Sequence, residues 1–182
     1  MFLYYATRDG QARRIAERIA SHVAQAGISA LPRNLLELTP PHDELQGQAP
    51  VVLVAAVRYG RHLPEAQRFL ARYARLVTPP PLVLLSVNLT ARKPSKTTPE
   101  GNTYLRKAIR RHRLRPVLAG AIAGRLDYPR YRWFDRQMIR LIMMMTGGPT
   151  DRAAQVEFTD WAQVEILAAR IVEICAGSDG TA

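Results

Sequence analysis

Residues 51–57 read Val-Val-Leu-Val-Ala-Ala-Val and give the clearest predicted strand in this chain of 182 residues. Every position in the run is apolar, whereas a strand with one face in water alternates apolar and polar residues. Continuous apolarity is typical of a parallel sheet with both faces covered. The run therefore predicts a buried strand in a layered domain that also contains helices.

Further apolar runs lie on both sides of this segment. They predict strands at residues 2–6, 28–34, 82–87 and 117–123. Apolar positions with helical spacing predict helices at residues 10–26, 64–77, 99–113 and 161–175. We expect Gly27 to end the first helix, Pro32 to restrict the second strand to an edge or an end, and Asp160 to cap the last helix. The alternation of strands and helices predicts an open, doubly wound α/β sheet.

Residues 125–158 do not fit this alternation and are predicted to be an insertion before the last helix. On a helical projection, one arc carries Tyr131, Phe134, Met138, Leu141, Ile142 and Met145, with Trp133 and Met144 beside it, and Arg132, Arg136 and Arg140 lie largely opposite. Such a helix reaches roughly 22 Å, short of the roughly 30 Å of a bilayer's hydrocarbon core. Two interpretations stay open: the helix lies in a membrane surface, or it packs on the domain with its methionines in the core.

The length fits one domain, predicted over residues 1–176, with a frayed C-terminal tail at residues 177–182. Apolar residues make up 47% and charged residues 23% of the chain, which argues against disorder. The single cysteine, Cys175, excludes an internal disulfide and fits a reducing cytosol. No leader pattern and no apolar run of membrane-spanning length occur in the sequence, so we expect a chain that is not exported.

The formal net charge is +11, and the excess lies in one segment. Residues 87–150 contain fourteen Lys and Arg against three Asp and Glu. The densest run holds Arg106, Lys107, Arg110, Arg111, Arg113 and Arg115. Such clustering indicates an anionic partner, which leaves nucleic acid, acidic lipid head groups or a carboxylate-bearing substrate, unless it is only a solvated basic face.

Three loops follow the predicted strands at the sheet edge where ligands gather in open parallel sheets. The first, residues 7–12, offers a hydroxyl, a glycine and free backbone N–H groups at a helix N-terminus, which suit a phosphate group; a simple capped turn is the alternative. The second and third loops offer Tyr59 for stacking and Asn88 for hydrogen bonds to a ring edge. FMN fits this combination. The predicted cofactor residues are Thr7, Arg8, Asp9, Gly10, Gln11, Ala12, Arg58, Tyr59, Gly60, Ser86, Val87, Asn88 and Leu89.

The sequence lacks the motifs of other common nucleotide-binding and catalytic sites. There is no G-x-G-x-x-G after the first strand, no P-loop G-x-x-x-x-G-K-[ST] and no nucleophile elbow G-x-S-x-G. The four histidines are spaced unlike metal ligands, so each is expected in a loop or at the surface: His22, His42, His62 and His112.

Five motifs together resemble those of the menaquinone-dependent protoporphyrinogen IX dehydrogenases, which are flavodoxin-like enzymes of haem synthesis. They are T-R-D-G-Q from residue 7, R-Y-G from residue 58, S-V-N-L-T-A-R-K-P from residue 86, Y-P-R-Y-R-W-F-D-R from residue 128 and G-G-P-T-D from residue 147. The resemblance implies a five-stranded sheet in the order 2-1-3-4-5 with helices on both faces, FMN as cofactor, and oxidation of protoporphyrinogen IX with a quinone, menaquinone or ubiquinone, as acceptor. It also implies a peripheral position on the cytoplasmic side of the inner membrane.

Flavodoxin phosphate loops usually end in a threonine, and Ala12 stands in that place here. The loss of one hydroxyl contact, worth about 0.5–1.5 kcal/mol, predicts weaker FMN binding rather than none.

The substrate of this family is a flat, apolar dianion, for which an apolar shelf flanked by cations is suited. Residues assigned to the substrate or to the membrane are Arg92, Lys93, Tyr128, Arg130, Tyr131, Arg132, Trp133, Phe134, Met138, Leu141 and Ile142. No side chain stands out as a general base. Two other classes of protein remain open. The first is an NAD(P)H:quinone reductase or soluble electron carrier with the same FMN loops, although carriers of this type are generally acidic. The second is a nucleic-acid binder, although no nucleic acid is expected as partner.

Overall fold

The computed structural model describes residues 1–127, 144 and 155–179. Its main sheet has five parallel strands, β1 (Phe2–Ala6), β2 (Pro32–Asn34), β3 (Val51–Arg58), β5 (Leu82–Val87) and β6 (Leu118–Ile122). Their order is β2-β1-β3-β5-β6, which confirms the expected order 2-1-3-4-5. Strand β2 lies at the edge, where Pro32 costs no hydrogen bond to a further strand.

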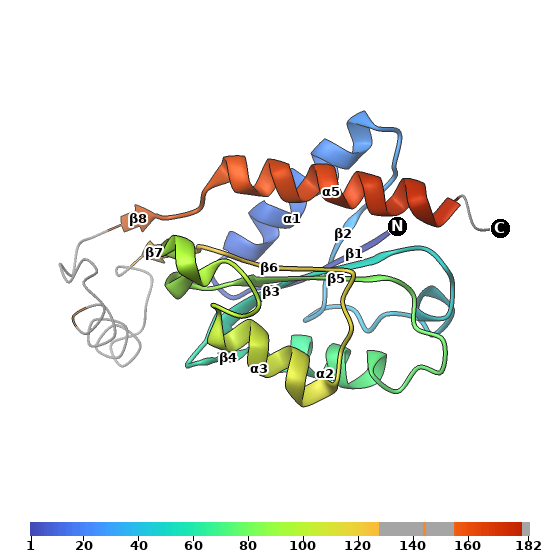
Figure 1. The fold of residues 1–182 in the computed structure, drawn as a ribbon, viewed down its shortest axis with the longest axis horizontal. Coiled ribbons are helices and arrows are strands. Elements are labelled where there is room, and N and C mark those ends of the chain that lie inside the picture. Colours follow the sequence, from blue (N-terminus) through green and yellow to red (C-terminus); the bar gives the residue numbers. More distant parts are fainter. Residues whose placement is uncertain (128–143, 145–154, 180–182) are drawn as a thin grey trace.

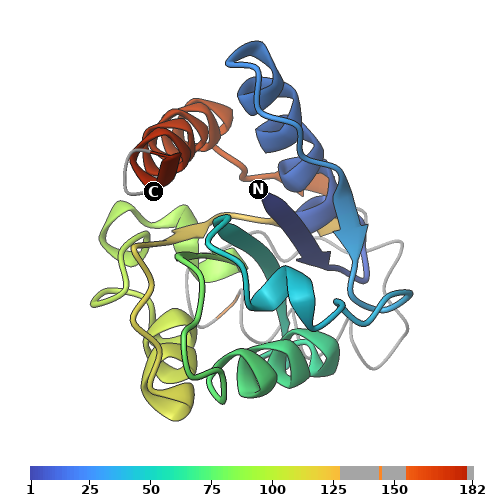
Figure 2. The ribbon, with the colours of Figure 1, turned by 90° about the vertical axis from the view of Figure 1, so that its right-hand side faces the viewer.

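Helices cover both faces of this sheet (Figure 1). Helices α1 (Gln11–Gln25) and α5 (Trp161–Asp179) lie on one face, and α2 (Pro64–Tyr73) and α3 (Thr103–His112) lie on the other. Figure 2, which looks along the strands, shows the same three layers end-on. The predicted doubly wound α/β fold is therefore confirmed.

The continuous apolarity of the strands follows from this layering. Val52 and Val54 pack with Ile15 of α1 and Ile171 of α5, whereas Leu53, between them in sequence, packs into the opposite core beneath α2 and α3. All of these side chains are fully buried. Because successive side chains of a strand point to opposite faces, both sets must be apolar when both faces are covered.

The ends predicted from Gly27 and Asp160 are confirmed, whereas α2 ends at Tyr73 instead of residue 77. Gly27 adopts a φ of 76°, and the N–H of Ile28 donates to the carbonyl of Val23, which is the hydrogen bond of a Schellman cap. The carboxylate of Asp160 accepts the N–H of Gln163, as an N-cap does. Helix α3 begins later than expected because Asn102 caps it through the N–H groups of Tyr104 and Leu105. Helix α5 runs to Asp179, so the helix extends into the segment expected as a frayed tail.

Several short elements were not predicted. A two-residue strand, β4 (Arg61–His62), pairs antiparallel with β3. Strands β7 (Arg125–Asp127) and β8 (Gln155–Glu157) pair antiparallel at the two ends of the predicted insertion. Three short 3₁₀ helices, η1 (Asp43–Leu45), η2 (Leu89–Arg92) and η3 (Pro94–Lys96), occupy connections.

The insertion between β7 and β8 falls largely outside the residues that the structure describes. The amphipathic helix expected there, with Arg136, Arg140 and Met145 among its residues, therefore stays a prediction. Among the described helices, none combines the length and apolarity needed to cross a bilayer.

Candidate functional site

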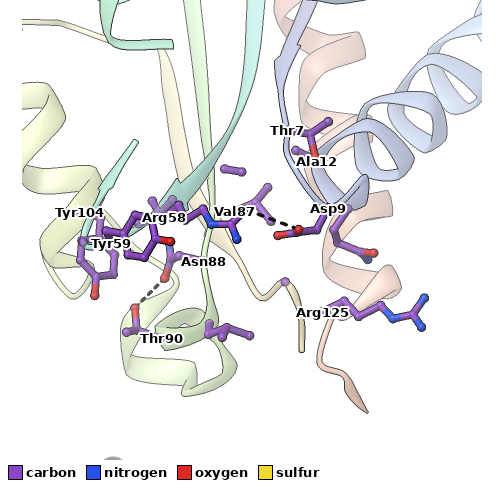
Figure 3. A pocket seen from close by; sticks show the side chains of 16 residues that line it. Thr7, Asp9, Ala12, Arg58, Tyr59, Val87, Asn88, Thr90, Tyr104 and Arg125 are labelled. Atoms are coloured by element: carbon purple, nitrogen blue, oxygen red, sulfur yellow. Dashed lines mark hydrogen bonds and ion pairs between the residues drawn. The ribbon is translucent and has the colours of Figure 1, made fainter. Parts of the chain in front are cut away.

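A pocket opens at the carboxyl ends of the parallel strands, at the end of the sheet where β4, β7 and β8 lie (Figure 1). Most of its lining comes from three connections that are far apart in sequence: β1 to α1, β3 to β4, and β5 to η2. Parallel strands bring their carboxyl ends to one edge, which is why these loops meet. Figure 3 shows Asp9 and Arg58 facing each other, Tyr59 beside Tyr104, and Arg125 at the opposite end.

Most of the predicted cofactor residues line this pocket. They are Thr7, Asp9, Gln11, Ala12, Arg58, Tyr59, Gly60, Val87, Asn88 and Leu89. Three others, Arg8, Gly10 and Ser86, lie in the same loops but are not among its lining residues. Six further residues line the pocket: Ala56, Val57 and Thr90 lie in the second and third predicted loops, whereas Tyr104, Gly124 and Arg125 were not predicted.

The loop that opens α1 is shaped for an anion. The Thr7 hydroxyl accepts the N–H of Gly10 at 3.0 Å, so its own proton stays available for a ligand. Gly10 adopts a φ of 87°, a conformation that glycine takes without the penalty of a side chain. The N–H groups of the first helical turn after it have no acceptor within the helix. The loop thus offers a ring of donors where the helix dipole favours negative charge.

Gln11 makes hydrogen bonds within the protein that the sequence did not predict. Its side chain is buried, and its amide nitrogen donates to Thr159 Oγ1 at 2.8 Å and to Glu157 Oε1 at 3.1 Å. Thr159 in turn donates to the carbonyl of Ala123. Gln11 therefore ties the start of α1 to β6 and to the chain that leads into α5.

Arg8 points away from the pocket, toward helix α2. Its guanidinium donates to both carboxylate oxygens of Glu65, at 2.5 and 3.1 Å, and the Glu65 side chain is buried. Burial raises the pKa of Glu65, but the hydrogen bonds and charge of Arg8 outweigh it, so the net pKa lies below the usual value. The two charges neutralise each other. Arg8 therefore attaches the loop to α2 instead of contacting a phosphate.

The connection between β3 and β4 is a two-residue hairpin turn. Tyr59 and Gly60 have φ values of 52° and 73°, as the favoured type I′ turn requires. A tyrosine in the left-handed region is strained, and its side chain is 57% exposed at the pocket. The guanidinium of Arg58 lies 5.6 Å from the Tyr59 ring centre, in cation–π range. The hairpin thus holds an aromatic face at the mouth of the pocket.

Asn88 organises the third loop with its side chain. Its Oδ1 accepts from the Ala91 N–H, from Thr90 Oγ1 at 2.6 Å and from Asn102 Nδ2 at 3.1 Å, while its Nδ2 donates to Ser86 Oγ. Because the amide is satisfied within the protein, we expect a ring edge to meet the backbone and neighbouring side chains of this loop rather than that amide.

His62 differs from the expectation of a loop or surface histidine. It lies on β4, is only 6% exposed, and its Nε2 is 2.9 Å from Ser86 Oγ. Burial, with a smaller effect of His112, lowers the pKa of His62 to about 4, so the ring is neutral near pH 7. The residues that bury it, among them Leu70 of α2 and Ala108 of α3, come from elements that are distant in sequence. Among the described residues, no cluster of potential metal ligands occurs.

Of the residues predicted to contact substrate or membrane, the structure describes two. Arg92 is half-buried and donates to the carbonyl of Leu89, while Lys93 is exposed. Neither lines the pocket. The others, Tyr128, Arg130, Tyr131, Arg132, Trp133, Phe134, Met138, Leu141 and Ile142, lie outside the described residues.

Comparisons with known proteins agree with this geometry. A family of flavodoxin domains matches residues 2–153. A protoporphyrinogen IX dehydrogenase (quinone) of Escherichia coli K12 is 42% identical over 172 residues, which cover 94% of each chain. A protein of the same name from Leishmania major is 34% identical over 167 residues, 91% of this chain and 71% of the relative.

Solved structures show the same fold at low sequence identity. A flavodoxin from the domain Archaea aligns with a TM-score of 0.50 and 11% identity over 97% of this chain and 99% of its own. A Streptococcus pneumoniae flavodoxin gives the same score and identity and covers 97% of both chains.

Proposed function

Since the chain belongs to the flavodoxin family and to the quinone-dependent protoporphyrinogen IX dehydrogenases, we propose that it oxidises protoporphyrinogen IX to protoporphyrin IX in haem synthesis and passes the electrons to menaquinone or another respiratory quinone. The observation that carries this proposal is 42% identity over 94% of both chains, with a pocket formed by the three loops that carry the sequence motifs.

FMN is the cofactor of this fold family, and the pocket fits it. The donors of the loop at residues 7–12 suit its phosphate, and the aromatic face of Tyr59 suits its ring system. When bound, FMN would accept a hydride from a substrate carbon and then pass the electrons to a quinone.

The residues of the chain hold and surround this group. The Thr7 hydroxyl and the first turn of α1 bind the phosphate. Arg58, between Asp9 and Tyr59, offsets the negative charge that Asp9 adds beside the phosphate. Val57, Val87 and Leu89 give the pocket apolar walls that exclude water from the ring.

The place of the reaction is a second part of the proposal. We propose a peripheral position on the cytoplasmic side of the inner membrane, where the quinone is dissolved. The sequence of the insertion, with an apolar arc opposite arginines, supports it, because such a helix can lie in an anionic lipid surface. Arg130 and Arg132 are proposed to contact lipid or substrate carboxylates, and Tyr128, Tyr131 and Trp133 to form an apolar shelf.

An anaerobic titration tests the reaction. The protein is reconstituted with FMN and mixed with protoporphyrinogen IX without oxygen, and the flavin absorbance is followed. We expect one FMN per chain and bleaching by the substrate, followed by reoxidation when a menaquinone analogue is added. A flavin that stays oxidised with protoporphyrinogen but bleaches with NADPH would instead indicate an NAD(P)H:quinone reductase.

Sedimentation with vesicles tests the location. Vesicles containing phosphatidylglycerol should pellet the wild-type protein, and replacement of Phe134, Met138 and Leu141 by Glu should release it. A matched variant with Glu at the exposed positions Val77, Val117 and Ile166 controls for the added negative charge. Equal sedimentation of the two triple variants would contradict the role given to the insertion.

A further inference from the structure

A second hollow lies on the other side of the β3–β4 hairpin, between β4, α2 and α3. Its volume is about 370 Å³, ample for a carboxylate with its alkyl stem. It is separate from the phosphate loop of α1, but Gly60 and Tyr104 line both hollows. The hairpin turn is therefore the common wall between the FMN pocket and this second cavity.

The cavity is cationic. Arg61, Lys107 and Arg111 line it, and no Asp or Glu is among the described residues that line it. In the described part of the chain, none of these three cations forms an ion pair, whereas Arg8, Arg14, Arg18 and Arg33 each pair with a glutamate. Three like charges around one hollow repel one another, and an anion placed between them relieves that repulsion.

Two histidines, His62 and His112, also line the cavity. His62 is 94% buried there with its Nε2 engaged by Ser86, which leaves Nδ1 as a second polar atom in a buried ring. Burial lowers the pKa of the neighbouring His112, and the charge of Arg111 lowers it further. Both histidines therefore favour the neutral form, and the positive charge of the cavity rests on the arginines and the lysine.

The position of the cavity indicates which anion it takes. The two hollows are adjacent, since Gly60 and Tyr104 line both, so a ligand at the mouth of the FMN pocket lies next to the cavity that holds Lys107 and Arg111. Gly60 has no side chain at this boundary, and a Cβ added there would lie 3.8 Å from the Tyr104 ring, in ordinary van der Waals contact. The proposed substrate is a tetrapyrrole whose propionates project from an apolar ring on flexible two-carbon stems.

We propose that the cavity formed by Arg61, Lys107 and Arg111 is the carboxylate subsite of this enzyme, which receives a propionate of the tetrapyrrole while its ring lies against the FMN pocket. The inference rests on the proposed function and adds to it the residues that select for a carboxylated substrate. It assigns a role to Lys107 and Arg111 of the basic run, neither of which lines the FMN pocket.

Substrate esterification combined with mutation tests this subsite. The FMN-loaded wild type is compared with Lys107→Gln/Arg111→Gln and with Arg106→Gln/Arg110→Gln, which removes the same charge from exposed positions of α3 outside the cavity. Arg61 stays intact because it belongs to the hairpin that carries Tyr59. Each protein receives protoporphyrinogen IX or its dimethyl ester, and binding of protoporphyrin IX is measured separately by fluorescence anisotropy.

We expect Lys107→Gln/Arg111→Gln to raise the KM for the diacid, and the Kd for protoporphyrin IX, by about 10-fold. With the dimethyl ester, this variant and the wild type should differ by less than about 2-fold, because the ester has no charge for the cations to bind. The control variant should match the wild type with both substrates, and FMN affinity should be equal in all three proteins.

Equal losses in the cavity variant and the control variant would overturn the subsite, because a general field effect would then explain them. An unchanged KM and Kd in the cavity variant would also overturn it. If the wild type oxidises neither the diacid nor the ester, the proposed function itself fails, and the subsite fails with it. If the wild type oxidises the diacid and only the subsite prediction fails, the function stands with its carboxylate contacts elsewhere.

Discussion

Arg58 Nη1 lies 3.7 Å from Oδ1 of Asp9, so an ion pair joins the end of β3 to the loop that opens α1 (Figure 3). The two residues are 49 positions apart in the sequence. Asp9 adds a negative charge to the loop proposed to bind a phosphate, and Arg58 lies where it offsets that charge. The ion pair thus couples the phosphate loop to the hairpin that carries Tyr59.

The Arg58–Asp9 pair is predicted to matter for FMN binding more than for folding. Arg58→Gln should lower FMN affinity by about 5- to 10-fold, because it removes a positive charge that lies beside the Asp9 carboxylate and the proposed phosphate position. Asp9→Asn combined with Arg58→Gln should recover most of that loss. Both side chains are partly exposed, so the thermal midpoint should change little. Flavin fluorescence titrations measure the affinities, and additive losses in the double variant would contradict the coupling.

Ala12 is predicted to limit phosphate binding. Ala12→Thr should raise FMN affinity by up to about 10-fold, since a hydroxyl at this position of the loop can donate one further hydrogen bond. Ala12 is fully buried, so the added volume has its own cost. Ala12→Val adds the same volume without the hydroxyl and serves as the control. A Thr variant that binds FMN no better than the Val variant would refute the prediction.

Tyr59 is predicted to lower the free energy of unfolding and to strengthen FMN binding. Its φ of 52° costs a tyrosine more than it costs an asparagine, so Tyr59→Asn should raise the free energy of unfolding by up to about 1 kcal/mol. The same change removes the aromatic face and should weaken FMN binding. Tyr59→Phe keeps the face and should leave affinity nearly unchanged. Urea denaturation of the FMN-free chain and flavin titration give the two quantities, and a destabilised Asn variant would be the contrary result.

His62 is predicted to make stability depend on pH. Its folded pKa of about 4 lies below the usual 6.5, so between these values the unfolded chain binds a proton that the folded chain does not. The free energy of unfolding should therefore be full above about pH 6.5 and should fall as the pH drops toward 4, by about 3 kcal/mol at most.

His62→Gln keeps a polar group near Ser86 Oγ and should remove this part of the pH dependence. Urea denaturation of both proteins from pH 4 to 7.5 isolates it as a difference between two curves. The ring itself can be followed by NMR in the folded state, and a titration centred near pH 6.5 would show that the environment of His62 is not the one described.

The fold was predictable because its main determinants are local in the sequence. The run 51–57 is apolar at every position, and the structure buries Val52 and Leu53 on opposite faces. Gly27 ends α1 where a left-handed residue is needed, and the order of the strands follows the resemblance in motifs. The three FMN loops were also predictable as a group, because each follows a parallel strand and such strands end at one edge.

The parts of the site that were missed depend on partners far away in the sequence. Arg8 belongs to the phosphate-loop motif, yet it pairs with Glu65 on α2. Tyr104 carries no motif and reaches the pocket only because α3 packs beside the β3–β4 hairpin. The 3₁₀ helix after β5 and the bonds that Asn88 makes to Asn102 depend on the same packing. No periodicity or spacing predicts these contacts.

The sequence by itself determined the layered sheet, the edge at which a ligand binds and the segment that carries the positive charge. Those properties follow from which residues are apolar, which loops follow strands and where the basic residues lie in the sequence. Only the tertiary structure decided which cations are paired and which are free to meet a ligand: Arg8 is neutralised by Glu65, whereas Lys107 and Arg111 line a hollow without an acid among residues 1–127, 144 and 155–179. The physical reason is that charge compensation acts over a few ångströms in space, and those distances exist only once the helices have packed on the sheet.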